Sequence, residues 1–258
     1  MVETVEAERF DHEAVGGATL PIKMECVTRL GKKVDVFVKC SSDQCSGGGL
    51  VRELIGCLLA QRLGFAVGCP VLVEFSDELL DQIRLVSPSA ANRMRAALRP
   101  AFGSIGLGPG FRLCRPPLPD SAVEVTATEI WAFDQLALNP DRNSTKPNCL
   151  INKDILAVID HEKALSVQGI GGLVPAPWED RWIPVSSHLF HDIVRSRNLE
   201  FQSLKDRWRT VDSGTIEEIL SSVPVTWDEE VKREVGIYLT DLSANLDQAF
   251  LNLERVGQ

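Results

Sequence analysis

The sequence predicts an α+β protein with two lobes, a small β-rich lobe over residues 1–112 and a mainly helical lobe over residues 113–258. Residues 33–39 alternate charged and apolar side chains, which is typical of a half-buried strand. Beyond residue 165, apolar residues recur at helical spacing instead. The 258 residues, 44% of them apolar, suffice for one large domain or for two lobes with a substantial core.

The first lobe follows an order of strand, helix, strand and helix. After the strand at 33–39, residues 50–63 carry apolar side chains on one side of a helix, and residues 70–75 form a second strand. Residues 77–98 are mainly helical, with an interruption at residues 87–89, where a proline stands between two serines.

The glycine- and proline-rich residues 100–120 form the expected crossing between the lobes. A helix over 123–138 should bury one apolar face and lead into the turn that follows it. Three further helices are expected, over residues 187–198, 214–222 and 228–256. For the last, Thr226 and Glu229 have the spacing of a capping box.

The most informative segment is Asn139–Leu165, which spaces three oxygen-bearing side chains along a predicted hairpin. Asp141 lies in a tight turn, Asn148 follows seven residues later, and Asp160 ends a short apolar strand. Two apolar runs flank the polar turn at 152–154, so the hairpin would bring Asn148 and Asp160 to the same open end.

These residue types suit a magnesium-dependent transfer of phosphate from a nucleotide. Mg²⁺ prefers hard oxygen ligands and is usually held by one or two carboxylates plus substrate phosphates, which fits Asn148 and Asp160. A further carboxylate is needed to orient the attacking hydroxyl and accept its proton, which fits Asp141. The spacing alone is equally consistent with an ordinary Asn/Pro/Asp turn and a strand-end cap.

Upstream, a lysine and a glutamate add to this interpretation. Lys39 ends the strand at 33–39, and Glu53 lies fourteen residues later in the helix at 50–63. An ion pair between them would hold the ammonium group where it meets nucleotide phosphates. Taken singly, each is more often a solvated strand end or helix position.

Two glycine-rich segments could approach the phosphates closely. Gly16 and Gly17 precede the strand that we expect to come first, and residues 47–49 are three glycines directly before the Glu53 helix. Backbone amides without bulky side chains bind anions well, and a helix N-terminus does the same. Either segment could equally be a plain loop, and the sequence does not choose between them.

Composition excludes several classes of protein. No uncharged apolar run reaches the length of a membrane span, and the acidic N-terminus lacks the features of a signal peptide. Seven cysteines without metal-ligand spacing fit reduced thiols, so we expect a soluble, cytoplasmic protein. A net charge of −9 argues against direct nucleic-acid binding.

Together these residues resemble the HipA-like kinases, which share a fold with the phosphatidylinositol kinases and, more distantly, the protein kinases. The similarity is greatest to the short branch with a single kinase domain, and it covers roughly residues 15–165. It rests on the order of Lys39, Glu53, Asp141, Asn148 and Asp160, and on three sequence matches: Asn139-Pro140-Asp141-Arg142, Pro147-Asn148 and Ile159-Asp160-His161-Glu162-Lys163-Ala164-Leu165.

The resemblance implies a bilobal, protein-kinase-like fold with ATP and Mg²⁺ as cofactors. Asp141 would be the catalytic carboxylate, and Asn148 and Asp160 the Mg²⁺ ligands. Lys39, with Glu53 as its partner, would contact the phosphates. Phe102 and Ser104, which match a Phe-Gly-Ser segment of that branch, would lie near the hinge between the lobes.

The resemblance also implies a serine/threonine protein kinase with a protein substrate. It is compatible with the toxin of a toxin–antitoxin pair, with an antitoxin or other regulatory protein as partner. One departure matters, because Glu162 stands where the family usually has glycine. That departure keeps open a nucleotide-binding pseudokinase that acts by binding a partner. A small-molecule or lipid kinase on the same scaffold is a further alternative, although a membrane lipid would suit a more basic surface.

Overall fold

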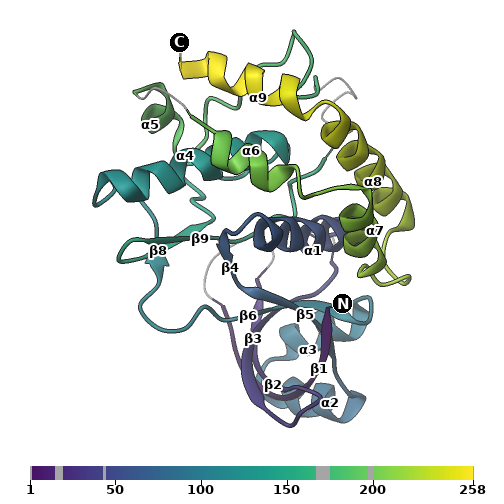
Figure 1. The fold of residues 1–258 in the computed structure, drawn as a ribbon. Coiled ribbons are helices and arrows are strands. Elements are labelled where there is room, and N and C mark those ends of the chain that lie inside the picture. Colours follow the sequence, from purple (N-terminus) through teal and green to yellow (C-terminus); the bar gives the residue numbers. More distant parts are fainter. Residues whose placement is uncertain (1, 15–19, 43–44, 167–174, 197–199, 258) are drawn as a thin grey trace.

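The computed structural model confirms the two-lobed α+β architecture, and it describes residues 2–14, 20–42, 45–166, 175–196 and 200–257. A β-barrel forms the lower lobe in Figure 1, and a cluster of helices forms the upper lobe. Helix α1 (Gly47–Arg62) lies between the two, so elements of both lobes meet along it.

Five strands close the barrel in the order β1, β2, β3, β6, β5, and β1 runs parallel to β5 while the other pairs are antiparallel. Apolar side chains alternate along the strands, so one face of each strand fills the barrel interior. The bounds are β1 Glu3–Glu13, β2 Ile22–Val27, β3 Lys33–Lys39, β5 Cys69–Glu74 and β6 Ala101–Ile105.

Two helices, α2 (Asp77–Val86) and α3 (Pro88–Ala96), pack on the barrel core. The predicted interruption between them is confirmed. The hydroxyl of Ser87 caps α3 by accepting from the backbone N–H of Ala90, and Pro88 occupies the first helical turn, where its missing N–H costs no hydrogen bond.

Helix α1 is held against the larger lobe by close packing at its glycine-rich start. Ser46 caps it through Gly49 N–H, and α1 contacts α7 (Ser213–Ser221) and α8 (Glu229–Ala244). A Cβ on Gly48 would lie 2.8 Å from Cγ2 of Val231, so glycine here permits the close approach of two helices.

A second sheet of four short strands connects the lobes, in the order β4, β9, β8, β7. Its strands β8 (Cys149–Asn152) and β9 (Ile155–Val158) are the two arms of the predicted hairpin. Strand β4 (Ala66–Val67) follows α1 and pairs with β9, and β7 (Arg112–Leu113), at the proposed boundary between the lobes, pairs with β8.

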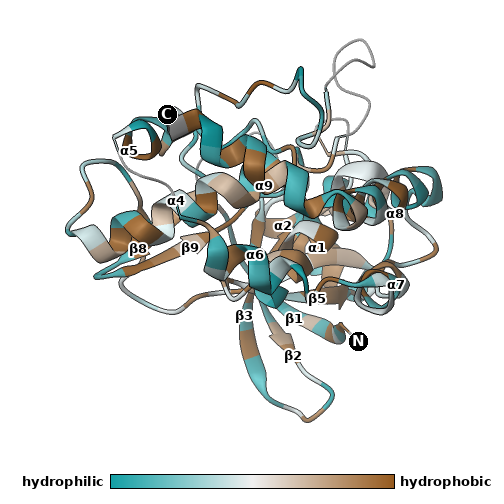
Figure 2. Ribbon diagram, turned by 45° about the horizontal axis from the view of Figure 1, so that its top comes forward, coloured by the Kyte–Doolittle hydropathy of each residue, from teal (hydrophilic) through white to brown (hydrophobic). Residues whose placement is uncertain are grey.

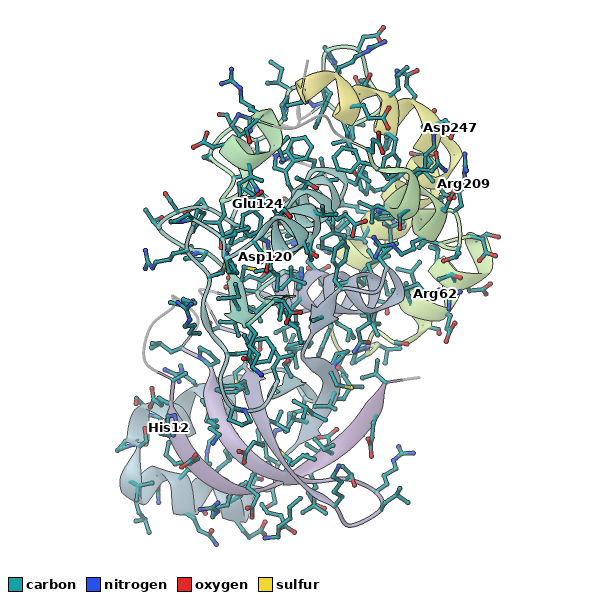
Figure 3. The ribbon with its side chains drawn as sticks, turned by 60° about the vertical axis from the view of Figure 1, so that its left-hand side comes forward. His12, Arg62, Asp120, Glu124, Arg209 and Asp247 are labelled. Atoms are coloured by element: carbon teal, nitrogen blue, oxygen red, sulfur yellow. The ribbon has the colours of Figure 1, made fainter. Side chains whose placement is uncertain are left out.

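Helix α4 (Ser121–Leu136) runs through the larger lobe and begins at Asp120, whose carboxylate accepts from the N–H groups of Ala122 and Val123 (Figure 3). Hydrophobic residues dominate α1 and β9, whereas the outer helices mix hydrophilic and hydrophobic positions (Figure 2). The remaining helices are α5 (His191–Arg195), α6 (Gln202–Trp208), α7, α8, α9 (Leu246–Glu254) and a short 3₁₀ turn, Arg255–Gly257.

Three expectations about the elements are wrong. Strands β1 and β2 both precede the strand at 33–39, and β1 comes before the Gly16 and Gly17 segment, so that segment does not precede the first strand. The expected helix over 228–256 is two helices that meet at Asn245. Asp228 caps α8 through the N–H of Val231, while the Thr226 hydroxyl donates to the carbonyl of Arg99 instead of forming a capping box.

No helix in the described residues is both long enough and apolar enough to cross a bilayer.

Candidate active site

Lys39 and Glu53 form an ion pair between the barrel strand β3 and helix α1. Lys39 ends β3 and Glu53 lies nearly two turns inside α1, and their Nζ and Oε2 atoms are 2.9 Å apart. Only 11% and 4% of the two side chains are exposed. The pairing predicted from their spacing is therefore present in the structure.

The same ammonium group also meets two carboxylates of the loop that follows β9. Asp160 Oδ1 lies 2.6 Å from Lys39 Nζ, and Glu162 Oε2 lies 3.8 Å from it. One positive charge is thus shared by three carboxylates, those of Glu53, Asp160 and Glu162.

This shared charge sets the protonation of the cluster. Burial lowers the pKa of Lys39, but the three carboxylates outweigh it, so the net pKa is raised and the ammonium stays charged. Burial raises the pKa of Asp160, but the charge and hydrogen bond of Lys39 outweigh it and hold the pKa below its usual value. For Glu53, burial dominates and the pKa is raised despite Lys39.

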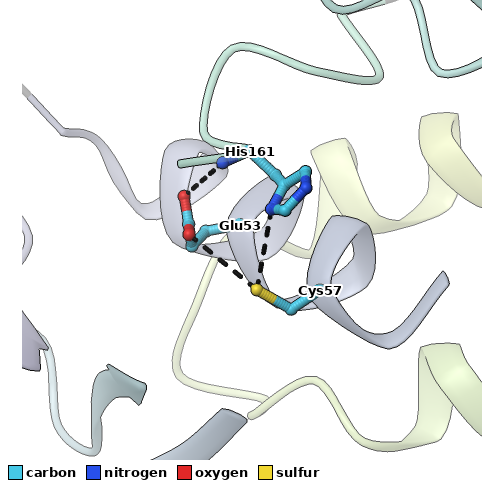
Figure 4. A group of neighbouring side chains, drawn as sticks. All are labelled: Glu53, Cys57 and His161. Carbon is cyan, nitrogen blue, oxygen red and sulfur yellow. Dashed lines mark hydrogen bonds between the residues drawn. The ribbon is translucent and has the colours of Figure 1, made fainter. Parts of the chain in front are cut away.

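Glu53 also fixes the loop that carries Asp160. Its Oε2 accepts a hydrogen bond from the backbone N–H of His161 at 2.8 Å, and its Oε1 lies 3.9 Å from the thiol of Cys57 (Figure 4). The Cys57 thiol lies 3.6 Å from His161 Nδ1. A Cβ on Gly56 would come within 2.5 Å of the Cβ of His161, so α1 and this loop pack against each other without a side chain between them.

Asp141 lies in the turn after α4, next to Asn148. The amide nitrogen of Asn148 donates to Asp141 Oδ2 at 3.3 Å and to the Asp141 carbonyl at 3.2 Å. Asn139 Oδ1 accepts from the backbone N–H of Asp141, which shapes the turn. The ammonium of Lys146 lies 3.5 Å from both carboxylate oxygens of Asp141 and faces solvent on one side.

Arg142 joins this turn to both arms of the hairpin. Its guanidinium is fully buried, pairs with Asp134 of α4, and donates to the carbonyls of Asn148 and Ile159. Asn148 and Asp160 have positive φ angles of 42° and 61°, and Ile159 N–H donates to the Asn148 carbonyl at 3.0 Å. The hairpin therefore places Asn148 and Asp160 side by side at its open end.

The other expected site residues have different surroundings. Phe102 pairs with Lys39 across β3 and β6, and its side chain is buried in the core that α1 shares with the larger lobe. Ser104 lies two residues further along β6, opposite Phe37, and close beside Gly68. Gly16 and Gly17 lie outside the described residues.

Three residues of the site, Asp134, Arg142 and Lys146, were given no role from the sequence, although Arg142 belongs to one of the matched motifs. Asp134 and Arg142 are eight residues apart and become partners only when α4 and the following turn pack together. The one available signal was a carboxylate in an otherwise apolar stretch of α4. Lys146 carried no signal, since a lysine in a polar turn is commonplace.

Comparisons with known proteins show the family and the fold of this chain. The model of the HipA-like kinase family matches residues 26–256. No curated protein sequence matches the chain. The structure is similar to that of the proinflammatory kinase CtkA of Helicobacter pylori, with a TM-score of 0.53, 11% identity and 96% of each chain covered.

A second similar structure is that of the Golgi casein kinase with Mn/ADP bound, with a TM-score of 0.49 and 11% identity over 96% of this chain and 74% of that one. The similarity to CtkA shows a kinase fold, and the family match spans nearly all of the sequence. The chain belongs to the HipA-like kinase family.

Proposed function

We propose that this kinase transfers the terminal phosphate of ATP, with Mg²⁺, to a serine or threonine of a protein. One observation carries the proposal. The ammonium of Lys39 contacts the carboxylates of Glu53 and Asp160 at 2.9 and 2.6 Å, and the turn that holds Asp141 and its partner Asn148 lies next to them. Phosphoryl transfer needs mainly positioning and neutralisation of charge, and these groups supply both.

Asp141 would accept the proton of the attacking hydroxyl. Its carboxylate is only partly buried and is oriented by Asn148 and by the backbone contact with Asn139, so a substrate hydroxyl can reach it from solvent. Lys146 adds a positive charge at the same position, where it would offset the charge that develops on the transferred group.

Lys39 would contact the nucleotide phosphates, held at the right depth by its buried partner Glu53. Ser104, on the strand paired with β3, would contact the nucleotide near the hinge, and Phe102 would support that strand from the core. The Gly16 and Gly17 segment, which joins β1 and β2 along the chain, remains our candidate for covering the phosphates.

The residues present fit a magnesium ion. The amide nitrogen of Asn148 is engaged by Asp141, which leaves its amide oxygen as the group available to a cation. One carboxylate oxygen of Asp160 contacts Lys39, and the other forms no hydrogen bond or ion pair with a described residue. Mg²⁺ bound by Asn148 and Asp160 would neutralise the phosphates and orient them toward Asp141.

The choice of a protein substrate and of a toxin–antitoxin role rests on the family rather than on the geometry. A regulatory protein such as an antitoxin would be the partner, and the proposed location is the cytoplasm. The acidic net charge of −9 favours a protein over an anionic membrane surface or nucleic acid as the contact.

The test is the transfer of terminally labelled phosphate from ATP and Mg²⁺ into a cell lysate and, separately, into extracted lipid, with wild type compared with Asp141→Asn. A labelled protein band that depends on Asp141, and that yields phosphoserine or phosphothreonine on hydrolysis, would support the proposal. Label in lipid alone would replace it with a lipid kinase. Absence of label from both samples, with folded protein, would favour a partner-binding role.

A further inference from the structure

Glu162 is a buried carboxylate, and one of its two oxygens has no hydrogen-bonding partner among the described residues. The residue is 5% exposed, and its Oε2 atom accepts no hydrogen bond from any described residue. Its nearest cations are Lys39, 3.8 Å from Oε2, and Lys163, 3.9 Å from Oε1, both beyond hydrogen-bonding distance. A buried charge in this state is costly unless a counter-charge reaches it.

The position of Glu162 is fixed by its backbone. Its carbonyl accepts a hydrogen bond from Arg52 Nε of α1 at 3.1 Å, and the preceding residue, His161, is bound through its N–H to Glu53. These backbone contacts place Glu162 beside Lys39, where its side chain lies buried.

The cluster as a whole holds three carboxylates but only one ammonium group among the described residues. Glu53, Asp160 and Glu162 each offer one carboxylate oxygen, and these three atoms lie within 4.8 Å of one another. Lys39 is the one cation that contacts all three carboxylates in the described part of the chain. Oxygens separated by such distances can share a metal ion that binds each at 2.0–2.6 Å, as Mg²⁺ and related ions do.

Two of the three carboxylates are available to such an ion. Glu53 Oε2 is already engaged by Lys39 and by the N–H of His161. Asp160 has one oxygen without a hydrogen bond or ion pair to a described residue, and Glu162 Oε2 accepts no hydrogen bond from one. We propose that Asp160 and Glu162 together bind a divalent cation before any nucleotide arrives.

This cation would take over from Lys39 as the counter-charge of Asp160 and Glu162. The ammonium would then be free to meet the phosphates while it stays anchored to Glu53. The release of Lys39 to the phosphates rests on the proposed function, because it assumes that the nucleotide binds at this site. With Glu162 as a second carboxylate ligand, the cation would stay in the site even when no nucleotide is bound.

The test measures Mn²⁺ binding to the full chain without nucleotide, with free Mn²⁺ followed by its electron paramagnetic resonance signal. Wild type should bind Mn²⁺ and release it to excess Mg²⁺. Glu162→Gln should raise the Kd for Mn²⁺ at least tenfold. Glu217→Gln, an exposed position on α7, should bind like wild type. Equal binding by wild type and Glu162→Gln, or no binding by wild type, would overturn the proposal.

Two additions keep the outcome decisive. If Glu162→Gln does not fold by circular dichroism, Glu162→Gly replaces it, because it removes the same carboxylate without leaving a buried amide. Phosphate transfer is assayed on the same wild-type preparation. Mn²⁺ binding without transfer would contradict the proposed function and leave the cation site standing. Transfer without nucleotide-free Mn²⁺ binding would contradict the cation site alone.

Discussion

Arg142 reaches back to Asp134, and both side chains are completely buried. The remaining guanidinium N–H groups bind the carbonyls of Asn148 and Ile159, the residues at the two ends of the β8–β9 hairpin. Asp134 also accepts from Asn139 and from His188. One buried charge pair therefore holds the Asp141 turn, Asn148 and the start of the Asp160 loop in register.

Removing the Asp134 carboxylate should destabilise the larger lobe strongly. In Asp134→Ala the guanidinium of Arg142 stays buried without its counter-charge, which costs about 3–5 kcal/mol. Urea unfolding of the variant measures this loss. The matched control is Asp247→Ala, which removes a carboxylate that pairs with Arg209 and Lys205 on the surface (Figure 3), and it should unfold close to wild type. Similar losses in both variants would contradict the special role of the buried pair.

A methyl group on Gly56 should push α1 away from the loop that carries Asp160. The new Cβ would lie 2.5 Å from Cβ of His161, so Gly56→Ala should cost about 1–3 kcal/mol by overpacking and should also weaken nucleotide binding. Gly214→Ala in α7 is the control, because its Cβ would meet only ordinary contacts at 3.6 Å and alanine favours the helix. Thermal unfolding measures both variants. Gly56→Ala should unfold at a lower temperature than wild type, and Gly214→Ala should not, because only the first introduces a close contact.

Acid should destabilise the protein in part through His188. Burial lowers the pKa of His188 more than the neighbouring Asp134 raises it, and the nearby charges of Arg142 and His191 lower it further. The neutral ring donates from Nε2 to Asp134 and accepts at Nδ1 from Phe190 N–H, a contact that protonation would break.

The folded-state pKa thus lies below the unfolded value of about 6.5, so this stability is present above pH 6.5 and is lost as the pH falls below it. The free energy of unfolding should decrease by up to about 1.4 kcal/mol per pH unit for this group. Urea unfolding at pH 7 and pH 5.5 should show a smaller decrease for His188→Gln than for wild type. His12→Gln, at an exposed strand position (Figure 3), should keep the wild-type decrease.

Asp160→Asn should separate the metal-binding role from general folding. Lys39 keeps Glu53 as a partner in this variant, so the protein should fold. We expect nucleotide binding that no longer strengthens when Mg²⁺ is added, because the carboxylate that would hold the ion is gone. Isothermal titration of ADP with and without Mg²⁺ measures this. If Mg²⁺ strengthens ADP binding as much in the variant as in wild type, Asp160 is not a ligand of the ion.

The local parts of the site could be predicted from the sequence because their partners are close along the chain or belong to a regular element. The hairpin was visible as two apolar runs around a polar turn, and Lys39 and Glu53 were visible as the end of a strand and a position in a helix. Their meeting with Asp160, 121 residues after Lys39, followed only through the family resemblance.

The remainder depends on tertiary packing that a single sequence does not encode locally. Strand β1 was missed because charged residues on its solvent face dominate its composition, while Val5 and Ala7 alone mark its buried face. The helix break at Asn245 follows no glycine or proline, and it arises where α9 turns to pack on the lobe. The Asp134–Arg142 pair likewise needed the fold to bring its partners together.

The central claim is that Asp141 takes the proton of the attacking group at a site that binds Mg²⁺ and ATP. It is tested most directly by comparing wild type, Asp141→Asn and Asp154→Asn, an exposed position in the turn of the same hairpin. Each is measured for the rate of phosphate transfer from ATP into lysate protein and for binding of a fluorescent ATP analogue. We expect Asp141→Asn to lose transfer by a factor of about 10²–10⁴ and to bind nucleotide like wild type, with Asp154→Asn unaffected in both. Transfer at the wild-type rate by folded Asp141→Asn would contradict the account.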